Sequence, residues 1–128
     1  QNAEAVRKKA MFDGAVAKSA AKDYEGAYAA FSTLCSQQID LACRNQAAVL
    51  MVQTTDVLKS AKRPNGEDCS QASLASDYCR PAFVKSVELL SKICPTTRTD
   101  DAFTAACNRR QELQSFIDAT DKRLGKSG

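Results

Sequence analysis

Six cysteines in a chain of 128 residues limit what this sequence can fold into more than any other feature. The number is even and is high for a cytosolic protein, so three disulfides are the first expectation. No two cysteines have the C-x2-C spacing of a zinc site, and the chain has no histidine. A zinc site made of four widely spaced thiolates is the alternative that remains open. The cysteines are Cys35, Cys43, Cys69, Cys79, Cys94 and Cys107.

Disulfides in this number indicate an oxidising compartment. The chain begins with Gln1 rather than methionine, as a mature protein does after removal of a signal peptide, although a sequence cut at an arbitrary point would look the same. No apolar run reaches the length of about 18 residues that a membrane-spanning helix needs. We therefore expect a periplasmic or secreted protein without a membrane span.

The net charge is small, because 18 Lys and Arg residues face 15 Asp and Glu residues and leave +3. The basic residues form short groups, such as Arg7-Lys8-Lys9, and acidic residues are interleaved with them. Proteins that bind nucleic acids usually collect their basic residues on one face. We interpret these groups as solvated helix faces and expect no nucleic-acid partner.

Apolar residues recur at helical spacing along almost the whole chain, and the alternation typical of strands is absent. The fold class is therefore predicted to be all-α, and the short loops favour antiparallel packing in a single helical domain over 1–128. The expected helices cover 2–21, 24–37, a segment from the cap Asp40 to the stop at Pro64-Asn65-Gly66, a short piece at 70–78, a segment from Pro81 to the stop at Pro95, and a last helix that ends before Gly125.

Two details of these helices follow from the same pattern. The first helix is expected to place an apolar stripe against the rest of the protein or against a partner, and Thr97 or Thr99 is expected to cap the last helix. The predicted stripe consists of Val6, Ala10, Met11, Val16 and Ala20.

Two segments of the chain resemble each other, at 31–46 and 90–110. Each has an apolar-Ser-x-apolar-Cys helix end, a polar turn, and an Ala-Cys helix start followed by Arg or Asn. The repeat predicts equivalent bonds in both places, which are Cys35–Cys43 and Cys94–Cys107. Cys69 and Cys79 then remain to pair with each other. The Cys94–Cys107 bond requires the long turn between the two cysteines to fold back, because Cys107 is expected about two turns inside its helix.

The run from Asp23 to Cys35 contains an Asp-Tyr-x-x-Ala-x-x-x-aromatic pattern and resembles the second helix of a tetratricopeptide or Sel1-like repeat. Cys43 follows Cys35 after seven residues, and this spacing is similar to that of disulfide-bearing Sel1-like repeats of secreted bacterial proteins. The resemblance covers about 8–60 and, faintly, 86–113. It implies a disulfide-stapled antiparallel helical bundle, or a short array of helical hairpins, that binds another protein.

The residues that most enzymes use are scarce in this chain. The lack of histidine excludes Ser-His-Asp and Cys-His catalysis, and no phosphate-binding loop or metalloprotease motif is present. The candidate acids and bases are more simply interpreted as turn residues or helix starts, and they are Glu67, Asp68, Asp100, Asp101 and Asp118. We therefore predict a protein that is not an enzyme and that has no cofactor.

An extracytoplasmic protein–protein interaction module is the predicted function, with an inhibitor or immunity-type envelope protein as one form of it. The alternative is a carrier that holds a small apolar ligand inside the helical bundle. The segment 63–81 fits no repeat and is expected to be clamped by its own disulfide, so it is either a binding surface or a structural clip. Candidate partner-binding residues are Tyr78, Arg80, Arg109 and Arg110.

Overall fold

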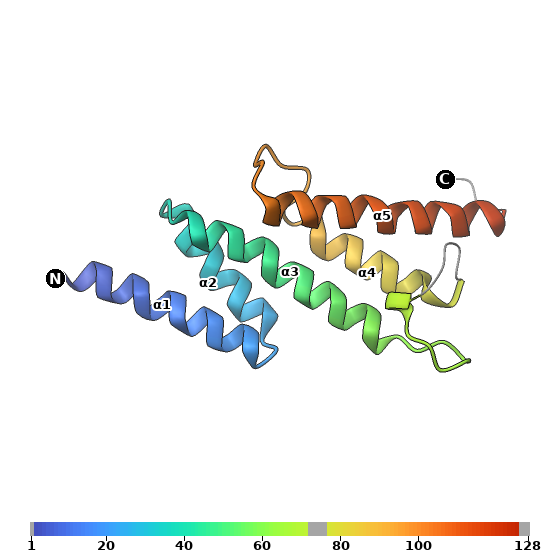
Figure 1. Ribbon diagram of the computed structural model, residues 1–128, viewed down its shortest axis with the longest axis horizontal. Helices are drawn as coiled ribbons and strands as arrows, with labels where there is room; N and C mark the ends of the chain where they lie inside the picture. Colours follow the sequence, from blue (N-terminus) through green and yellow to red (C-terminus); the bar gives the residue numbers. More distant parts are fainter. Residues whose placement is uncertain (1, 72–76, 126–128) are drawn as a thin grey trace. The chain divides into compact units, whose positions relative to one another are not determined.

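The computed structural model describes residues 2–71 and 77–125 and is all-α, as predicted (Figure 1). Within those ranges no strand occurs, apart from one isolated bridge between Lys62 and Asp68. The elements in chain order are α1 (Ala3–Ala20), α2 (Tyr24–Ser36), α3 (Asp40–Ser60), the short 3-10 helices η1 (Cys69–Gln71) and η2 (Asp77–Cys79), α4 (Arg80–Leu90) and α5 (Asp101–Arg123).

The chain forms two compact units, which we describe separately. The first ends at Gln53 and contains α1, α2 and the beginning of α3. The second begins at Thr54 and contains the remainder of α3, the two short helices, α4 and α5.

In the first unit, α1 and α2 form an antiparallel hairpin (Figure 1). Each helix starts at a side-chain cap, since Asn2 accepts a hydrogen bond from the backbone N–H of Ala5 and Asp23 accepts one from that of Gly26. The Phe12 ring meets the Phe31 ring edge-on, with 5.3 Å between centroids. Half of the buried cluster around this contact is alanine, and its members are Ala15, Ala27, Phe31, Leu34, Ala42 and Val49.

The predicted stripe of α1 does not pack against the rest of its unit, and its members do not share one side of the helix. All five of its residues are exposed, while the inward face consists of Lys8, Phe12, Ala15 and Ser19. The inward residues are spaced by three or four positions and therefore share one side of a helix, whereas Val6, Met11 and Val16 are spaced by five and diverge around it. The true stripe was hidden because its members include Lys8 and Ser19 and because alanines occur on every side of this helix.

In the second unit, α4 packs on α5, with the Phe83 and Phe116 rings 5.4 Å apart. The prediction that Thr97 or Thr99 caps α5 is wrong. The N-cap is Asp100, whose side chain accepts a hydrogen bond from the backbone N–H of Phe103. The negative charge of its carboxylate also interacts favourably with the positive end of the helix dipole, whereas a threonine hydroxyl carries no charge. Gly125 follows the helix with a φ of +77°, a conformation that glycine adopts without strain.

The three disulfides have the predicted connectivity. The Cα–Cα distances are 4.6 Å for Cys35–Cys43, 5.5 Å for Cys69–Cys79 and 5.6 Å for Cys94–Cys107. The turn between α4 and α5 folds back along α5, which brings Cys94 to a cysteine in the second turn of that helix. All six cysteines are bonded, which is consistent with an oxidising environment.

The helix predicted at 70–78 is only partly correct. Ser70 and Gln71 belong to the single turn η1, and Asp77 and Tyr78 belong to the single turn η2. The intervening 72–76 lie outside the described residues.

Loss of the Cys94–Cys107 bond should destabilise the second unit. Changing both cysteines to serine removes a cross-link over 13 positions, and the chain-entropy estimate for such a loop is about 3 kcal/mol. Guanidinium unfolding followed by circular dichroism measures the loss. The Cys35→Ser and Cys43→Ser pair is the matched control, because it opens a shorter loop in the other unit and should leave the Phe116 region unchanged in NMR spectra. A loss below about 1 kcal/mol would contradict the stapling role of this bond.

Two glycines inside helices should respond differently to alanine. Gly14 has no heavy atom near the position of an added Cβ, so Gly14→Ala should stabilise the protein by about 0.5–1 kcal/mol. At Gly26 the added Cβ would lie 2.4 Å from an oxygen of Asp23, the cap of α2. Gly26→Ala must therefore displace that cap, which offsets the gain in helix propensity. Thermal unfolding of the two variants checks this, and equal stabilisation by both would show that Asp23 contributes nothing as a cap.

Candidate functional site

The three arginines predicted to bind a partner all have partners within the second unit. Arg80 forms a bidentate ion pair with Asp121, at 2.6 and 2.9 Å, and this pairing raises the pKa of the Arg80 guanidinium. Arg109 pairs with Glu112 on the same helix, and the Arg110 Nε donates to the Ser91 hydroxyl at 2.8 Å. These contacts give each arginine a structural role within the second unit.

Tyr78 differs from the arginines, because 58% of it is exposed. It lies in η2, between Asp77, which pairs with Arg123 of α5, and the buried Cys79. Its backbone is therefore anchored on both sides while the ring faces solvent. An anchored and exposed tyrosine has the properties of an interface residue.

The segment that leads to η1 is fixed by hydrogen bonds. The backbone N–H of Cys69 donates to the Ala61 carbonyl at 2.8 Å, and that of Arg63 donates to the Glu67 carbonyl at 2.7 Å. The Ser70 hydroxyl and backbone N–H both donate to Asp68, and these bonds, the hydroxyl first, lower the pKa of that carboxyl. This half of the predicted clip is rigid, and 72–76 lie outside the described residues.

The first unit carries an apolar groove that sequence reasoning missed. Its volume is about 300 Å³, and α1, α2 and the part of α3 within the first unit all contribute to it. Val16 and Val52, 49% and 48% exposed, belong to α1 and α3, and the buried ring of Phe31 in α2 lies between those helices in the lining. We call this site the α1–α3 groove, and its lining residues are Val16, Ser19, Ala20, Phe31, Asn45, Ala48, Val49 and Val52.

A pattern in the sequence of α3 could have revealed this groove. On α3, Leu41, Asn45, Ala48 and Val52 follow one another at spacings of four, three and four, so they share one side of the helix. Leu41, Ala48 and Val52 are exposed, and Asn45 is half-buried. Another face of α3, which includes Cys43, Ala47 and Leu50, is buried.

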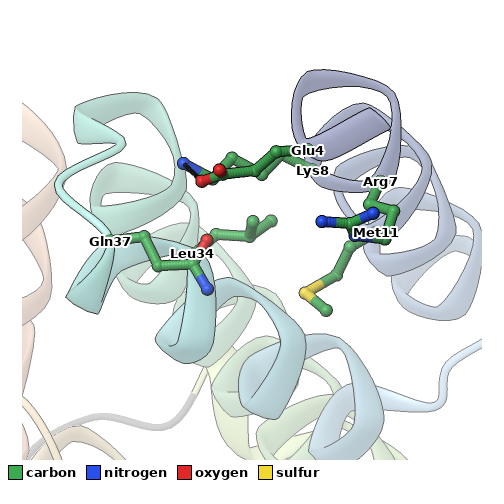
Figure 2. A pocket seen from close by; sticks show the side chains of 6 residues that line it. All are labelled: Glu4, Arg7, Lys8, Met11, Leu34 and Gln37. Atoms are coloured by element: carbon green, nitrogen blue, oxygen red, sulfur yellow. Dashed lines mark ion pairs between the residues drawn. The ribbon is translucent and has the colours of Figure 1, made fainter. Parts of the chain in front are cut away.

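A smaller and more polar recess lies on the other flank of α1 (Figure 2). Its volume is about 260 Å³. In Figure 2, Arg7 and Met11 reach into it from α1, Gln37 faces them from the end of α2, and the Glu4–Lys8 ion pair lies along one wall. We call this site the α1–α2 recess, and its lining residues are Glu4, Arg7, Lys8, Met11, Leu34 and Gln37.

Among the described residues, no group of three or more His, Cys, Asp and Glu side chains is placed to hold a metal ion. Within the same ranges, no helix combines the length and the apolar composition that a membrane span requires.

Comparison with models of protein families found no match, and searches of curated proteins and of solved structures found no similar protein.

The arginine contacts lead to a testable difference. The Asp121 side chain is only 15% exposed, so Arg80→Gln removes a bidentate partner from a partly buried carboxylate and should destabilise the protein more than Arg109→Gln does. Arg109→Gln breaks a more exposed pair within one helix and should cost less than about 0.5 kcal/mol. Urea unfolding of both variants measures the difference. Equal and small losses would show that the Arg80–Asp121 pair is dispensable for folding, and would make Arg80 available for another role.

Proposed function

We propose that this protein is an extracytoplasmic protein–protein interaction module, periplasmic or secreted, whose α1–α3 groove receives apolar side chains of a partner protein. The observation that carries the proposal is the groove itself, in which two half-exposed valines flank a buried phenylalanine. Burying such apolar surface contributes about 25 cal/mol for each Å² removed from water. An inhibitor or immunity-type protein of a bacterial envelope is one form of this function.

The scaffold supports this role because the groove is preorganised. The Cys35–Cys43 bond ties the end of α2 to the first turn of α3, and these are two of the three helices that line the groove. Phe31, the residue that α2 contributes to the lining, is fixed by the edge-on contact with Phe12 of α1. A groove fixed in this way loses little conformational entropy when a partner binds. Helical hairpins that bind proteins are also what the resemblance to tetratricopeptide and Sel1-like repeats implies.

Site-specific photo-crosslinking identifies the partner. A crosslinking amino acid at Ala48 lies in the groove, and the same amino acid at Ala29 lies on the exposed side of α2 and lines none of the described sites. In the extracytoplasmic protein fraction of the source, the Ala48 position should give one covalent adduct that the Ala29 position does not. Adducts of equal yield at both positions would contradict a binding site in the groove.

The affinity of the captured partner then tests the apolar contact. Val16→Glu and Val52→Glu place a carboxylate against apolar surface that the partner covers, and each should weaken binding at least about tenfold. Val6→Glu is the matched control, because Val6 is an exposed valine of α1 outside the groove lining, and this variant should bind normally. Unchanged affinity in both groove variants would overturn the proposal.

The carrier alternative has a separate readout. Native mass spectrometry of the purified protein should show the mass of the polypeptide with its three disulfides and nothing more. A bound small molecule that survives gel filtration would favour the carrier over the interaction module.

A further inference from the structure

The α1–α2 recess has one uncompensated charge. Glu4 and Lys8 neutralise each other across 3.0 Å, and Lys9, next to the recess on α1, pairs with Asp13 at 2.7 Å. Arg7 lines the recess, is exposed, and has no ion pair within the described part of the chain. The three charged residues of the lining therefore leave one positive charge, and it is a guanidinium.

The hydrogen-bonding groups of the recess are mainly donors. The Arg7 guanidinium and the Gln37 amide face each other across it (Figure 2). The Leu34 carbonyl already accepts hydrogen bonds from the backbone N–H groups of Gln37 and Ile39, at 3.1 and 3.2 Å. A carboxylate matches this arrangement, since it accepts hydrogen bonds from both a guanidinium and an amide.

The rest of the lining is apolar and adaptable. Met11 lies beside Arg7, is 42% exposed, and carries an unbranched thioether that adjusts to irregular shapes. The volume of about 260 Å³ is below the range of about 300–1,000 Å³ typical of sites for drug-sized ligands. The space suits one or two side chains rather than a larger molecule.

We infer that the α1–α2 recess binds an acidic segment of a partner protein, in which an Asp or Glu carboxylate contacts Arg7 and Gln37 and a neighbouring apolar side chain contacts Met11. This inference rests on the proposed function as an interaction module, and it names the chemistry of the partner segment at a second site. The charge of the recess excludes a basic segment, because a cation there would meet Arg7 and find Glu4 already paired.

A pair of short peptides tests the inference without knowledge of the partner. The probe is an acetylated and amidated Gly-Leu-Glu-Gly peptide, and its uncharged counterpart is Gly-Leu-Gln-Gly. Titration of the native protein, followed by NMR, should shift the Met11 methyl signal and the Gln37 side-chain amide. The Glu peptide should bind about fivefold more tightly than the Gln peptide, as expected for a partly exposed ion pair.

Two variants of neighbouring residues locate the effect. Arg7→Gln should reduce the preference for the Glu peptide to about one, while Lys9→Gln, which removes the same charge outside the recess, should keep it. Circular dichroism should show the same helical signal for both variants. Equal binding of the two peptides to the native protein, no shift at Met11 and Gln37, or an equal loss in Lys9→Gln would each overturn the inference.

These outcomes are distinguishable from a failure of the proposed function. The peptide titration reads the recess directly and uses no partner, whereas the valine variants of the groove read the binding of the captured partner. A positive titration together with unchanged partner affinity in both groove variants would place the binding activity in the recess, and the reverse would leave it in the groove alone.

Discussion

The edge-on contact between Phe12 and Phe31 is the interaction on which the first unit depends. The other members of the buried cluster around these rings are small or aliphatic, and three of them are alanines. Ala15 is the one residue of α1 that is fully buried, so Phe12 is the large side chain through which this helix packs on α2. The same Phe31 ring lies within the lining of the α1–α3 groove, so the contact that assembles the unit also shapes its apolar surface.

Small side chains in a core leave a modest hydrophobic gain, and the disulfides offset this deficit. Each bond closes a short stretch of chain where a helix ends or begins, at sequence separations of 8, 10 and 13. None of them joins the first unit to the second. The covalent bonds therefore reinforce local turns, and the packing within each unit depends on its aromatic contacts.

The helices and the cysteine pairing could be predicted because they are encoded locally. Helical periodicity, Pro81 at the start of α4 and Gly125 after α5 mark the elements, and the repeated Ser-x-apolar-Cys pattern gave the pairing. The inward face of α1 could not be predicted in this way, because a helix with alanine on all sides has no dominant apolar stripe.

The groove and the recess are assembled from residues far apart in the chain, and local sequence patterns do not reveal which of these residues come together. Val16 and Val52 are 36 positions apart in the sequence, and nothing in their local pattern associates them. Arg80, in contrast, is conspicuous beside Cys79 and Pro81, yet its guanidinium already forms an ion pair with Asp121. The ion pairs of an arginine are visible only after folding, and for this reason Arg7 was missed and Arg80 was selected. The resemblance to tetratricopeptide and Sel1-like repeats stays a prediction.

The attachment of α1 has a thermodynamic consequence for the two surfaces. This helix meets the rest of its unit along the narrow line of Lys8, Phe12, Ala15 and Ser19, and only Ala15 is fully buried. Its detachment separates the Phe12 and Phe31 rings but leaves α2 and α3 joined by the Cys35–Cys43 bond, so it costs less free energy than global unfolding. The groove and the recess each lose a wall when α1 detaches. Any molecule that binds at either site therefore also stabilises the docked form of α1, because both linings include residues of this helix.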